Sequence, residues 1–288
     1  MSKILLALLL VALTVGSAWT FWSGNWWFVH PISEHGPKVD DQFNRTLVVV
    51  GFAFITCQLA LAWAVFRYGR KGNERSKYTH GNNKLEAVWT VITAVVFVVV
   101  AVYGQIVWAG IHLNQPSDAE ATNIEVVAQQ FQWNFHYPGA DGVTGKTNTK
   151  FINDGSLNFV GVDPDDPNGK DDIQISTLVV PEKRPVALRI RSKDVIHSLF
   201  VPALRIKQDA VPGMNVRIHF KATEVGKYEI ACAELCGSLH FNMKTFLLVL
   251  PQEDYDALTA MTPEKYKERL GQLMERYEVN SSKVIAAN

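Results

Sequence analysis

The sequence predicts N-terminal transmembrane helices followed by an all-β sandwich domain. Apolar residues are concentrated in the first 110 of the 288 positions, in runs long enough to cross a bilayer. After residues 114–117, apolar side chains recur mainly at alternate positions, in short segments separated by Pro and Gly. This period of two is typical of strands with one buried face, and several short strands of this kind favour a sandwich.

Residues 1–22 form the first apolar segment, in which a single lysine precedes an almost wholly apolar run from Ile4 to Trp22. One interpretation is a signal peptide, with Gly16 and Ala18 as the small residues around a cleavage point. The other is an uncleaved helix of about the minimum length that spans a membrane. An uncleaved helix is the interpretation that we favour.

Two longer apolar runs predict membrane helices over residues 43–67 and 84–111. The loop between them is short and basic, and its positive residues are Arg67, Arg70, Lys71, Arg75, Lys77 and Lys84. Because positive charges are enriched in cytoplasmic loops, this loop is predicted on the cytoplasmic side of a bacterial-type inner membrane. The residues after Ile111 are then expected on the periplasmic side.

Residues 118–251 are predicted to form the periplasmic β domain. Strand-like alternation is found at residues 124–137, 173–180, 186–190, 216–220, 227–231 and 245–250. We interpret residues 139–172 as an insertion in this domain. Residues 252–288 are a polar, partly helical tail without a catalytic grouping, and they could pack on a neighbouring subunit or on the domain itself.

The insertion is strongly acidic. Between Asp118 and Asp172 there are ten carboxylates against three lysines. A solvated loop is the favoured interpretation, a docking surface for a basic protein is second, and a calcium loop is third. The calcium loop is disfavoured because the glycine and the closing glutamate of an EF-hand are absent from their required positions.

The residues with the richest chemistry lie in one loop near the C-terminal end, together with one histidine upstream. The loop carries Cys232, Cys236, His240 and Met243, and the upstream histidine is His197. Thiolate, imidazole and thioether groups are the soft and borderline ligands that copper prefers. Two cysteines four positions apart can bridge the same pair of ions, so the loop predicts two coppers that share both sulfurs.

Two other interpretations of these residues are weaker. Neighbouring cysteines outside the cytoplasm often form a disulfide, but a disulfide would leave the histidines and the methionine unexplained. Zinc rarely uses methionine, and its paired cysteines usually stand closer, as C-x-x-C. The third cysteine, Cys57, lies in an apolar run and is interpreted as a small hydrophobic residue.

Motifs that the sequence lacks exclude several function classes. There is no C-x-x-C-H motif, so no c-type haem is expected on this chain. There is also no Ser, His and Asp grouping, no phosphate-binding loop and no credible pair of catalytic carboxylates. The chain is therefore expected to carry out redox chemistry only, and no nucleic acid partner is expected.

Three segments resemble subunit II of the haem–copper cytochrome c oxidases, namely residues 194–202, 207–213 and 232–243. Together with the two helices upstream, the resemblance covers residues 43–250. It implies a cupredoxin-like Greek-key sandwich in which a metal loop joins the last two strands. It also implies that cytochrome c delivers electrons to a binuclear copper centre, which passes them to haem in subunit I. Dioxygen would be reduced to water there, with proton translocation, and this chain would hold no dioxygen centre.

The resemblance also implies roles for individual ligands. His197 and Met243 would complete one copper, and His240 with the backbone carbonyl of Glu234 would complete the other. The two cysteines of the loop would bridge both ions. The side chain of Glu234 would bind magnesium at the boundary with subunit I.

Electron entry and proton entry are further roles that the resemblance implies. In the family an exposed tryptophan accepts the electron; here Phe131 stands at that position and Trp133 matches the second aromatic residue. Both are candidates. Glu86 resembles a glutamate at the cytoplasmic entrance of a proton channel, although a carboxylate near a helix end can also simply reach the membrane interface. Expected partners are subunits I and III, cytochrome c and membrane lipid.

Three alternative functions fit less well. The quinol oxidase form of the same architecture lacks copper, whereas this chain has the full ligand set. A nitrous oxide reductase needs a further catalytic domain rich in histidine, and eight histidines in the whole chain cannot supply it. A copper chaperone needs exposed, exchangeable ligands, whereas five ligands on a rigid sandwich would retain their metal.

Overall fold

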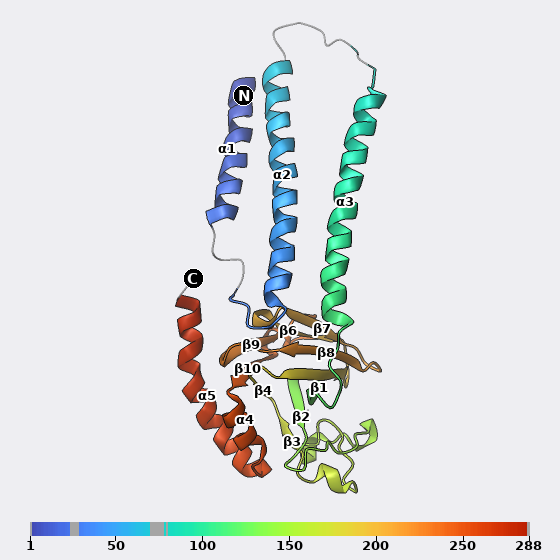
Figure 1. Cartoon of the computed structure of the whole chain (residues 1–288), viewed down its shortest axis with the longest axis vertical. Helices are drawn as coiled ribbons and strands as arrows, with labels where there is room; N and C mark the ends of the chain where they lie inside the picture. The colour runs from blue at the N-terminus through green and yellow to red at the C-terminus, as the bar shows by residue number, and fades with distance from the viewer. Residues whose placement is uncertain (1, 24–28, 70–77, 79, 287–288) are drawn as a thin grey trace. The chain divides into compact units, whose positions relative to one another are not determined.

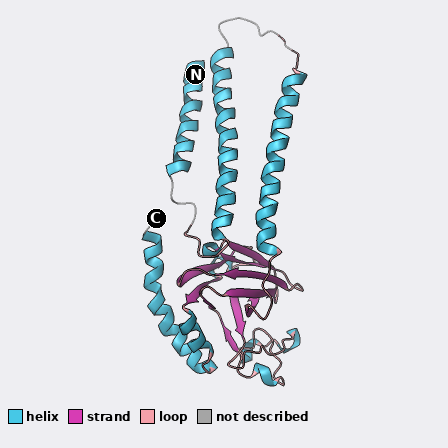
Figure 2. Cartoon of the chain, viewed as in Figure 1, coloured by secondary structure: helices cyan, strands magenta, loops and turns pink. Residues whose placement is uncertain are grey.

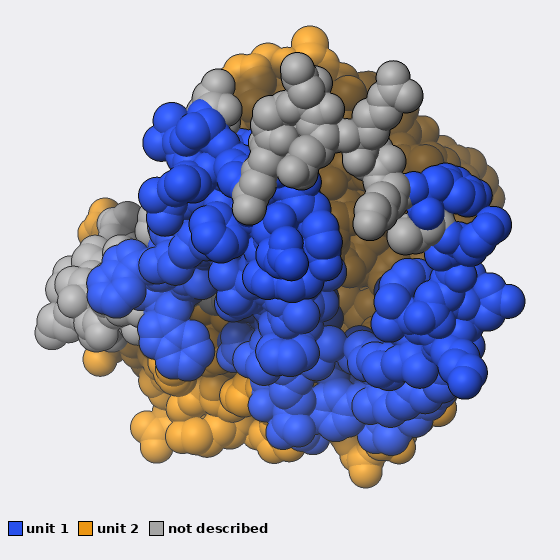
Figure 3. Space-filling view, turned by 90° about the horizontal axis from the view of Figure 1, so that it is seen from above, with its two compact units in different colours: residues 1–27, 38–110 blue, residues 28–37, 111–288 orange. Residues whose placement is uncertain are grey.

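A computed structural model describes residues 2–23, 29–69, 78 and 80–286 of the chain. The chain divides into two compact units, which Figure 3 shows in different colours. We call them the helical unit, comprising Met1–Trp27 and Lys38–Gly110, and the β unit, comprising Phe28–Pro37 and Ile111–Asn288. Part of the predicted basic loop lies outside the described residues, namely Arg70, Lys71, Arg75 and Lys77.

Within the described residues, three helices are long and apolar enough to cross a membrane, and they are α1 (Lys3–Ser23), α2 (Gly36–Tyr68) and α3 (Asn83–His112) (Figures 1 and 2). The ends of α3 agree closely with the prediction. However, α2 begins well before residue 43, because Ser33 Oγ accepts a hydrogen bond of 2.9 Å from the Gly36 N–H and Pro37 suits a first helical turn. Helix α1 covers the first apolar segment, and its retention in the mature protein stays a prediction.

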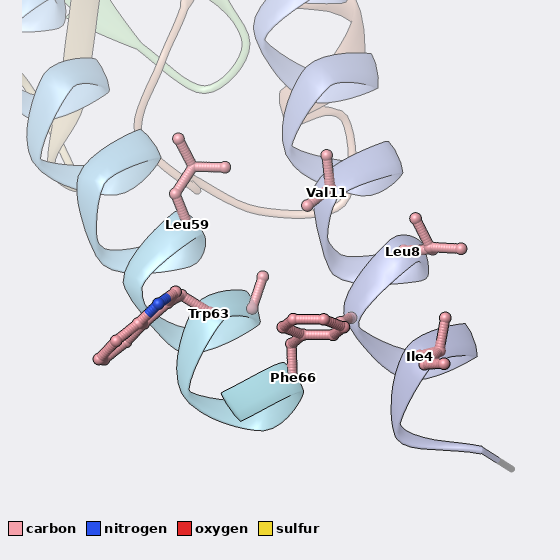
Figure 4. Close-up of a pocket in the computed structure, with 8 residues that line it drawn as sticks. Ile4, Leu8, Val11, Leu59, Trp63 and Phe66 are labelled. Atoms are coloured by element: carbon pink, nitrogen blue, oxygen red, sulfur yellow. The ribbon is translucent and has the colours of Figure 1, made fainter. Parts of the chain in front are cut away.

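An apolar groove of about 320 Å³ lies between α1 and α2 (Figure 4). Ala7 and Ala62 are buried within it. The larger side chains that line it are Ile4, Leu8, Val11, Leu59, Trp63 and Phe66. An entirely apolar lining is what the hydrocarbon core of a bilayer requires of side chains between two spanning helices.

The β unit contains two five-stranded sheets. In order across the first sheet, the strands are β3 (Ile173–Ile175), β2 (Gln132–Tyr137), β1 (Thr122–Gln129), β5 (Pro185–Ser192) and β8 (Val216–Lys221). In order across the second, they are β4 (Leu178–Pro181), β10 (Lys244–Leu250), β9 (Gly226–Cys232), β6 (His197–Val201) and β7 (Ile206–Ala210). The pairs β1–β5 and β4–β10 are parallel, and the other neighbours are antiparallel. One core of buried residues joins both sheets, so the predicted sandwich is confirmed.

Two predicted strand segments are each divided in the structure. Residues 124–137 form a hairpin of β1 and β2, which turns at Gln130 and Phe131. Residues 173–180 form β3 in the first sheet and β4 in the second, so the chain changes sheets at Ser176 and Thr177. Strand β7 shows no alternation in its sequence, Ile-Lys-Gln-Asp-Ala, which explains why the pattern did not predict it.

The C-terminal tail packs on the β unit. It forms α4 (Gln252–Thr259) and α5 (Pro263–Ala286), and α5 contacts β9. Four buried side chains lie on one face of α5 at helical spacing, and they belong to the core of the sandwich: Tyr266, Leu270, Leu273 and Tyr277. Burial of a leucine side chain contributes roughly 1.5–3 kcal/mol, so the tail is an integral layer of the domain.

The insertion is mostly a solvated loop, as predicted. Its short 3-10 helices are η1 (Thr149–Phe151), η2 (Asp154–Ser156) and η3 (Pro167–Gly169). The carboxylates of Asp141, Asp154 and Asp165 are exposed, but that of Asp172 at its end is only 1% exposed. The prediction of a solvated loop is therefore wrong for Asp172, because this residue pairs with a buried histidine of the sandwich.

We call Glu125, His136, Asp172 and Arg191 the His136 network. The buried imidazole of His136 lies between two carboxylates, with Nε2 2.6 Å from Asp172 Oδ2 and Nδ1 3.2 Å from Glu125 Oε2. Arg191 Nε donates to the other oxygen of Glu125 at 2.6 Å. Burial opposes the charge on His136, but the two carboxylates outweigh it and raise the pKa of the imidazole. The network thus anchors the end of the insertion to β1, β2 and β5.

Candidate metal centre

The loop between β9 and β10 carries four side chains of the predicted centre. Its base is closed by a hydrogen bond from the Cys232 N–H to the Met243 carbonyl at 3.0 Å. Near its far end, residues His240–Asn242 form the 3-10 helix η5. Between them Gly237 adopts a φ of +135°, which favours glycine and lets the chain reverse after Cys236.

The sulfur atoms of this loop converge. The Sγ atoms of Cys232 and Cys236 are 3.9 Å apart, and both cysteines are free thiols. From the Sγ of Cys236, the Sδ of Met243 lies at 3.8 Å and the Nδ1 of His240 at 3.6 Å. The Sγ of Cys232 lies 3.3 Å from the backbone carbonyl oxygen of Glu234, while the side chain of Glu234 is exposed. Five donor groups therefore surround one point of the loop.

His197 joins this cluster from the neighbouring strand. It is the first residue of β6, which pairs with β9 so that Leu199 lies opposite Cys232. The imidazole is buried, and its ligand nitrogen and both cysteine Sγ atoms all lie within 4.8 Å of one another. All six residues that the sequence implied as copper ligands are thus brought together in the β unit.

Asp194 determines which nitrogen of His197 faces the thiols. Its Oδ1 lies 2.8 Å from His197 Nε2, so Nε2 carries a proton and donates a hydrogen bond to the carboxylate. In the neutral imidazole, Nδ1 is then the nitrogen with the free lone pair. It is buried and has no hydrogen-bond partner among the residues that the structure describes. A buried lone pair directed toward two thiols fits a metal ion, because a bound ion would accept this lone pair.

The charge of Asp194 is also well supported. Its partial burial opposes ionisation, but hydrogen bonds from the Gln130 N–H, the His197 imidazole and the Val195 N–H outweigh this effect and lower its pKa. The carboxylate therefore stays ionised near neutral pH and holds the imidazole in one tautomer.

The thiols themselves favour a bound cation. Burial, together with the neighbouring Cys232, raises the pKa of the Cys236 thiol to about 11. Two adjacent thiolates are therefore costly unless positive charge lies between them. Together with two imidazoles and a thioether, they form the soft donor set that suits copper.

Both aromatic candidates for electron entry lie beside the centre, Phe131 next to Gly237 and Trp133 next to His197. Phe131 is half-buried, and its ring packs so closely on Gly237 that a Cβ there would lie 3.0 Å from Phe131 Cζ. Trp133 is only 1% exposed, and its ring lies edge-on to His197 with centroids 6.2 Å apart. Of the two, Phe131 is therefore the one that a docking protein can touch.

Glu86 does not belong to this cluster, since it lies in the first turn of α3 in the helical unit. Conversely, two residues near the metal ligands were not predicted. Asp194 precedes His197 by three residues, and a carboxylate beside a candidate ligand histidine is a usable signal for it. Gln130 donates from Nε2 to the Cys236 carbonyl at 2.6 Å, and nothing in the sequence indicates that contact.

Family comparisons agree with this geometry. Residues 122–249 match the family described as cytochrome c oxidase subunit II, periplasmic domain, and residues 25–106 match the transmembrane domain of the same subunit. The alternative cytochrome c oxidase subunit 2 of Bradyrhizobium diazoefficiens is 35% identical over 253 residues, which cover 87% of this chain and 89% of that protein. Cytochrome c oxidase subunit 2 of Thermostichus vulcanus is 30% identical over 263 residues, which cover 82% of this chain and 79% of that protein.

Among solved structures, the periplasmic domain of subunit II of cytochrome oxidase from Bradyrhizobium japonicum is similar to 52% of this chain. The match covers 98% of that domain, with 24% identity and a TM-score of 0.38. Together with the two sheets, the family matches confirm the predicted membrane helices followed by an all-β periplasmic domain. The chain therefore belongs to the subunit II family of the cytochrome c oxidases, which are oxidoreductase complexes.

Proposed function

We propose that this chain accepts electrons from a cytochrome c at a binuclear copper centre and passes them to haem in subunit I. The observation that carries the proposal is the convergence of both cysteine Sγ atoms, the His197 imidazole and the Met243 Sδ on one point. When bound there, two coppers sharing both thiolates would exchange one electron with little structural change. The reduction of dioxygen to water and the translocation of protons then belong to subunit I.

Two groups of donors support two ions. Besides the cysteines, His197 and Met243 are fully buried, whereas His240 is half-buried and the Glu234 carbonyl belongs to an exposed residue. We assign the first pair to one copper and the second pair to the other. The sandwich holds these groups rigidly because Cys232 and His197 begin or end paired strands.

Electron entry is assigned to the outer face of the loop. Phe131 is partly accessible and packs on Gly237, which follows the ligand Cys236 directly. Trp133 is buried against His197, so we assign it a packing role beside the ligand. The acidic insertion supplies negative charge on the same domain, and such charge would steer a basic cytochrome c toward it.

The loop also offers a surface to the oxidase. Leu235 and Phe241 are 80% and 70% exposed, and large apolar side chains beside a metal loop are typical of an interaction surface. We assign this surface to subunit I, toward which His240 would pass the electron. The exposed side chain of Glu234 is then available to bind magnesium at that boundary.

The three apolar helices support membrane anchoring. We propose a multi-pass protein of a bacterial-type inner membrane, with the β unit on the periplasmic side, and with subunit I, subunit III and membrane lipid as neighbours. In this orientation the first turn of α3 lies near the cytoplasmic face. Glu86 in that turn is assigned to the entrance of a proton channel leading into subunit I.

Copper stoichiometry tests the central proposal. The full chain, purified in detergent and loaded with copper, is expected to bind two ions and to show an electron paramagnetic resonance signal of one electron shared between them. Cys236→Ser is expected to lose this signal, while Cys57→Ser outside the loop retains it. One copper per chain with the spectrum of an isolated ion contradicts the shared-sulfur arrangement.

A further inference from the structure

The metal ligands come from two segments that are held together at one point by β pairing. The Ala233 N–H donates to the Ser198 carbonyl at 3.0 Å, and Leu199 lies opposite Cys232 in the β6–β9 pair. Cys236 lies beyond the end of β9, in the part of the loop that leaves the sheet. The position of its sulfur relative to His197 must therefore depend on contacts outside this pairing.

Gln130 contacts both segments, although it lies on neither. It occupies the turn between β1 and β2, which belong to the other sheet. Its side-chain Nε2 donates to the carbonyl oxygen of Cys236 at 2.6 Å, and its backbone N–H donates to Asp194 Oδ2 at 2.7 Å. The other oxygen of Asp194 binds His197 Nε2 at 2.8 Å. One residue thus links the cysteine loop to the carboxylate that orients the histidine.

The glycine after Cys236 makes this contact possible. A Cβ at Gly237 would lie 2.8 Å from Gln130 Nε2, which is closer than real Cβ atoms approach, and 3.0 Å from Phe131 Cζ, which is tighter than most such contacts. The turn is therefore pressed against the loop at this point. The amide of Gln130 reaches the Cys236 carbonyl because no side chain stands between them.

We infer that Gln130 is a positioning residue for the copper centre, which fixes the loop at Cys236 relative to His197. Residue 130 is largely exposed, so burial of apolar area does not explain its contact with the loop. Its two hydrogen bonds instead end on a nearly buried cysteine and on the carboxylate that supports a ligand. The consequence for copper rests on the proposed function, whereas the consequence for the loop does not.

The test compares Gln130→Met with the matched control Gln132→Met in the full chain in detergent. Gln130→Met keeps the backbone bond to Asp194 and removes only the side-chain donor. The control removes the bond from Gln132 Nε2 to Asn134 Oδ1, 2.7 Å long, away from the loop. A copper chelator is expected to remove the metal about 2- to 10-fold faster from Gln130→Met than from the control, the effect of one net hydrogen bond. The copper hyperfine pattern is also expected to change in Gln130→Met alone.

A second readout does not require copper. In the reduced, copper-free chain, amide hydrogen exchange of residues 235–243 is expected to be faster in Gln130→Met by a similar factor. Gln130→Glu, which places a carboxylate against the carbonyl, is expected to give a larger effect. If the unaltered chain binds no copper, the proposed function fails and the exchange data still decide the role of Gln130. Copper release and exchange equal to those of Gln132→Met overturn the inference.

Discussion

Removing the charge from the His136 network tests how the acidic insertion is held. His136→Gln retains a polar side chain of similar reach but cannot carry a positive charge. In the structure the imidazole lies 2.6 Å from Asp172 Oδ2 and 3.2 Å from Glu125 Oε2. Glu125 keeps Arg191 as a partner in the variant, at 2.6 Å, whereas the nearly fully buried Asp172 loses its cation.

The magnitude follows from this loss. Breaking a buried ion pair by removing one partner costs roughly 3–5 kcal/mol, and the lower end applies because the Gly145 N–H still donates to Asp172. A change of about 3 kcal/mol shifts the opening equilibrium of the insertion by roughly 100-fold, since about 1.4 kcal/mol corresponds to tenfold.

Trypsin cleavage measures this opening directly, because the insertion contains Lys146, Lys150 and Lys170. When reclosing is fast, cleavage follows the population of the open form. We expect cleavage of the full chain in detergent to be about 100-fold faster in His136→Gln. The control Asp154→Asn removes a pair with Lys193 in which the carboxylate is 59% exposed, and should change the rate less than about fivefold. Equal rates in the two variants would refute the anchoring role of His136.

The same network predicts a pH dependence. The pKa of His136 is raised in the folded chain, so its contribution is complete below its ordinary value of about 6.5 and is lost as pH rises through the folded value. The pKa of Glu125 is lowered, because hydrogen bonds from His136 and Arg191 outweigh its burial, so its contribution is lost only in acid. Cleavage, normalised to an unstructured peptide, should therefore accelerate in alkali in the unaltered chain and stay level in His136→Gln.

Three further predictions concern other parts of the chain. Gly237→Ala should strain a residue at φ +135° and weaken copper retention by roughly 1–3 kcal/mol. The control Gly271→Ala, where the added Cβ meets open space, should leave copper retention unchanged. Equal copper retention in the two variants contradicts the prediction. Leu273→Ala should lower the free energy of unfolding by about 2–5 kcal/mol in a denaturant titration. Glu275→Ala, at an exposed position of the same helix, should change this free energy by less than about 0.5 kcal/mol. Glu86→Ala should slow proton uptake during turnover and leave the copper spectrum unchanged, and unaltered turnover removes Glu86 from the channel.

The clustering of the candidate copper ligands could be predicted from the sequence because Cys232, Cys236, His240 and Met243 lie within twelve positions, and their residue types are rare in combination. The apolar helices could be predicted because length and composition suffice to identify a spanning segment. Strand order could not be predicted, since alternating apolar residues indicate only that one face of a strand is buried. They carry no information on which strand lies next to it in the sheet. For this reason the change of sheet after β3 appeared only in the structure.

Polar contacts between residues far apart in the sequence could not be predicted either. His136 stands in an aromatic strand and pairs with Asp172, thirty-six residues away, in a loop that composition marks as solvated. Gln130 reaches Cys236 across 106 positions. The tail was predicted to be helical from its composition, but its burial follows from Tyr266 and Leu273 sharing one helix face against the core.

The two sheets contribute different residues to the end of the sandwich that carries the candidate metal centre. Every candidate metal donor belongs to β6, to the end of β9 or to the β9–β10 loop, whereas the half-buried aromatic residue Phe131 is supplied by the β1–β2 hairpin. Under the proposed function, a change of redox partner can be accommodated by exchanging Phe131 at the hairpin tip while Gln130 beside it is kept. On the same proposal, selection for a new donor acts on the hairpin and selection for a constant potential acts on the two ligand segments, and the two meet at Gln130.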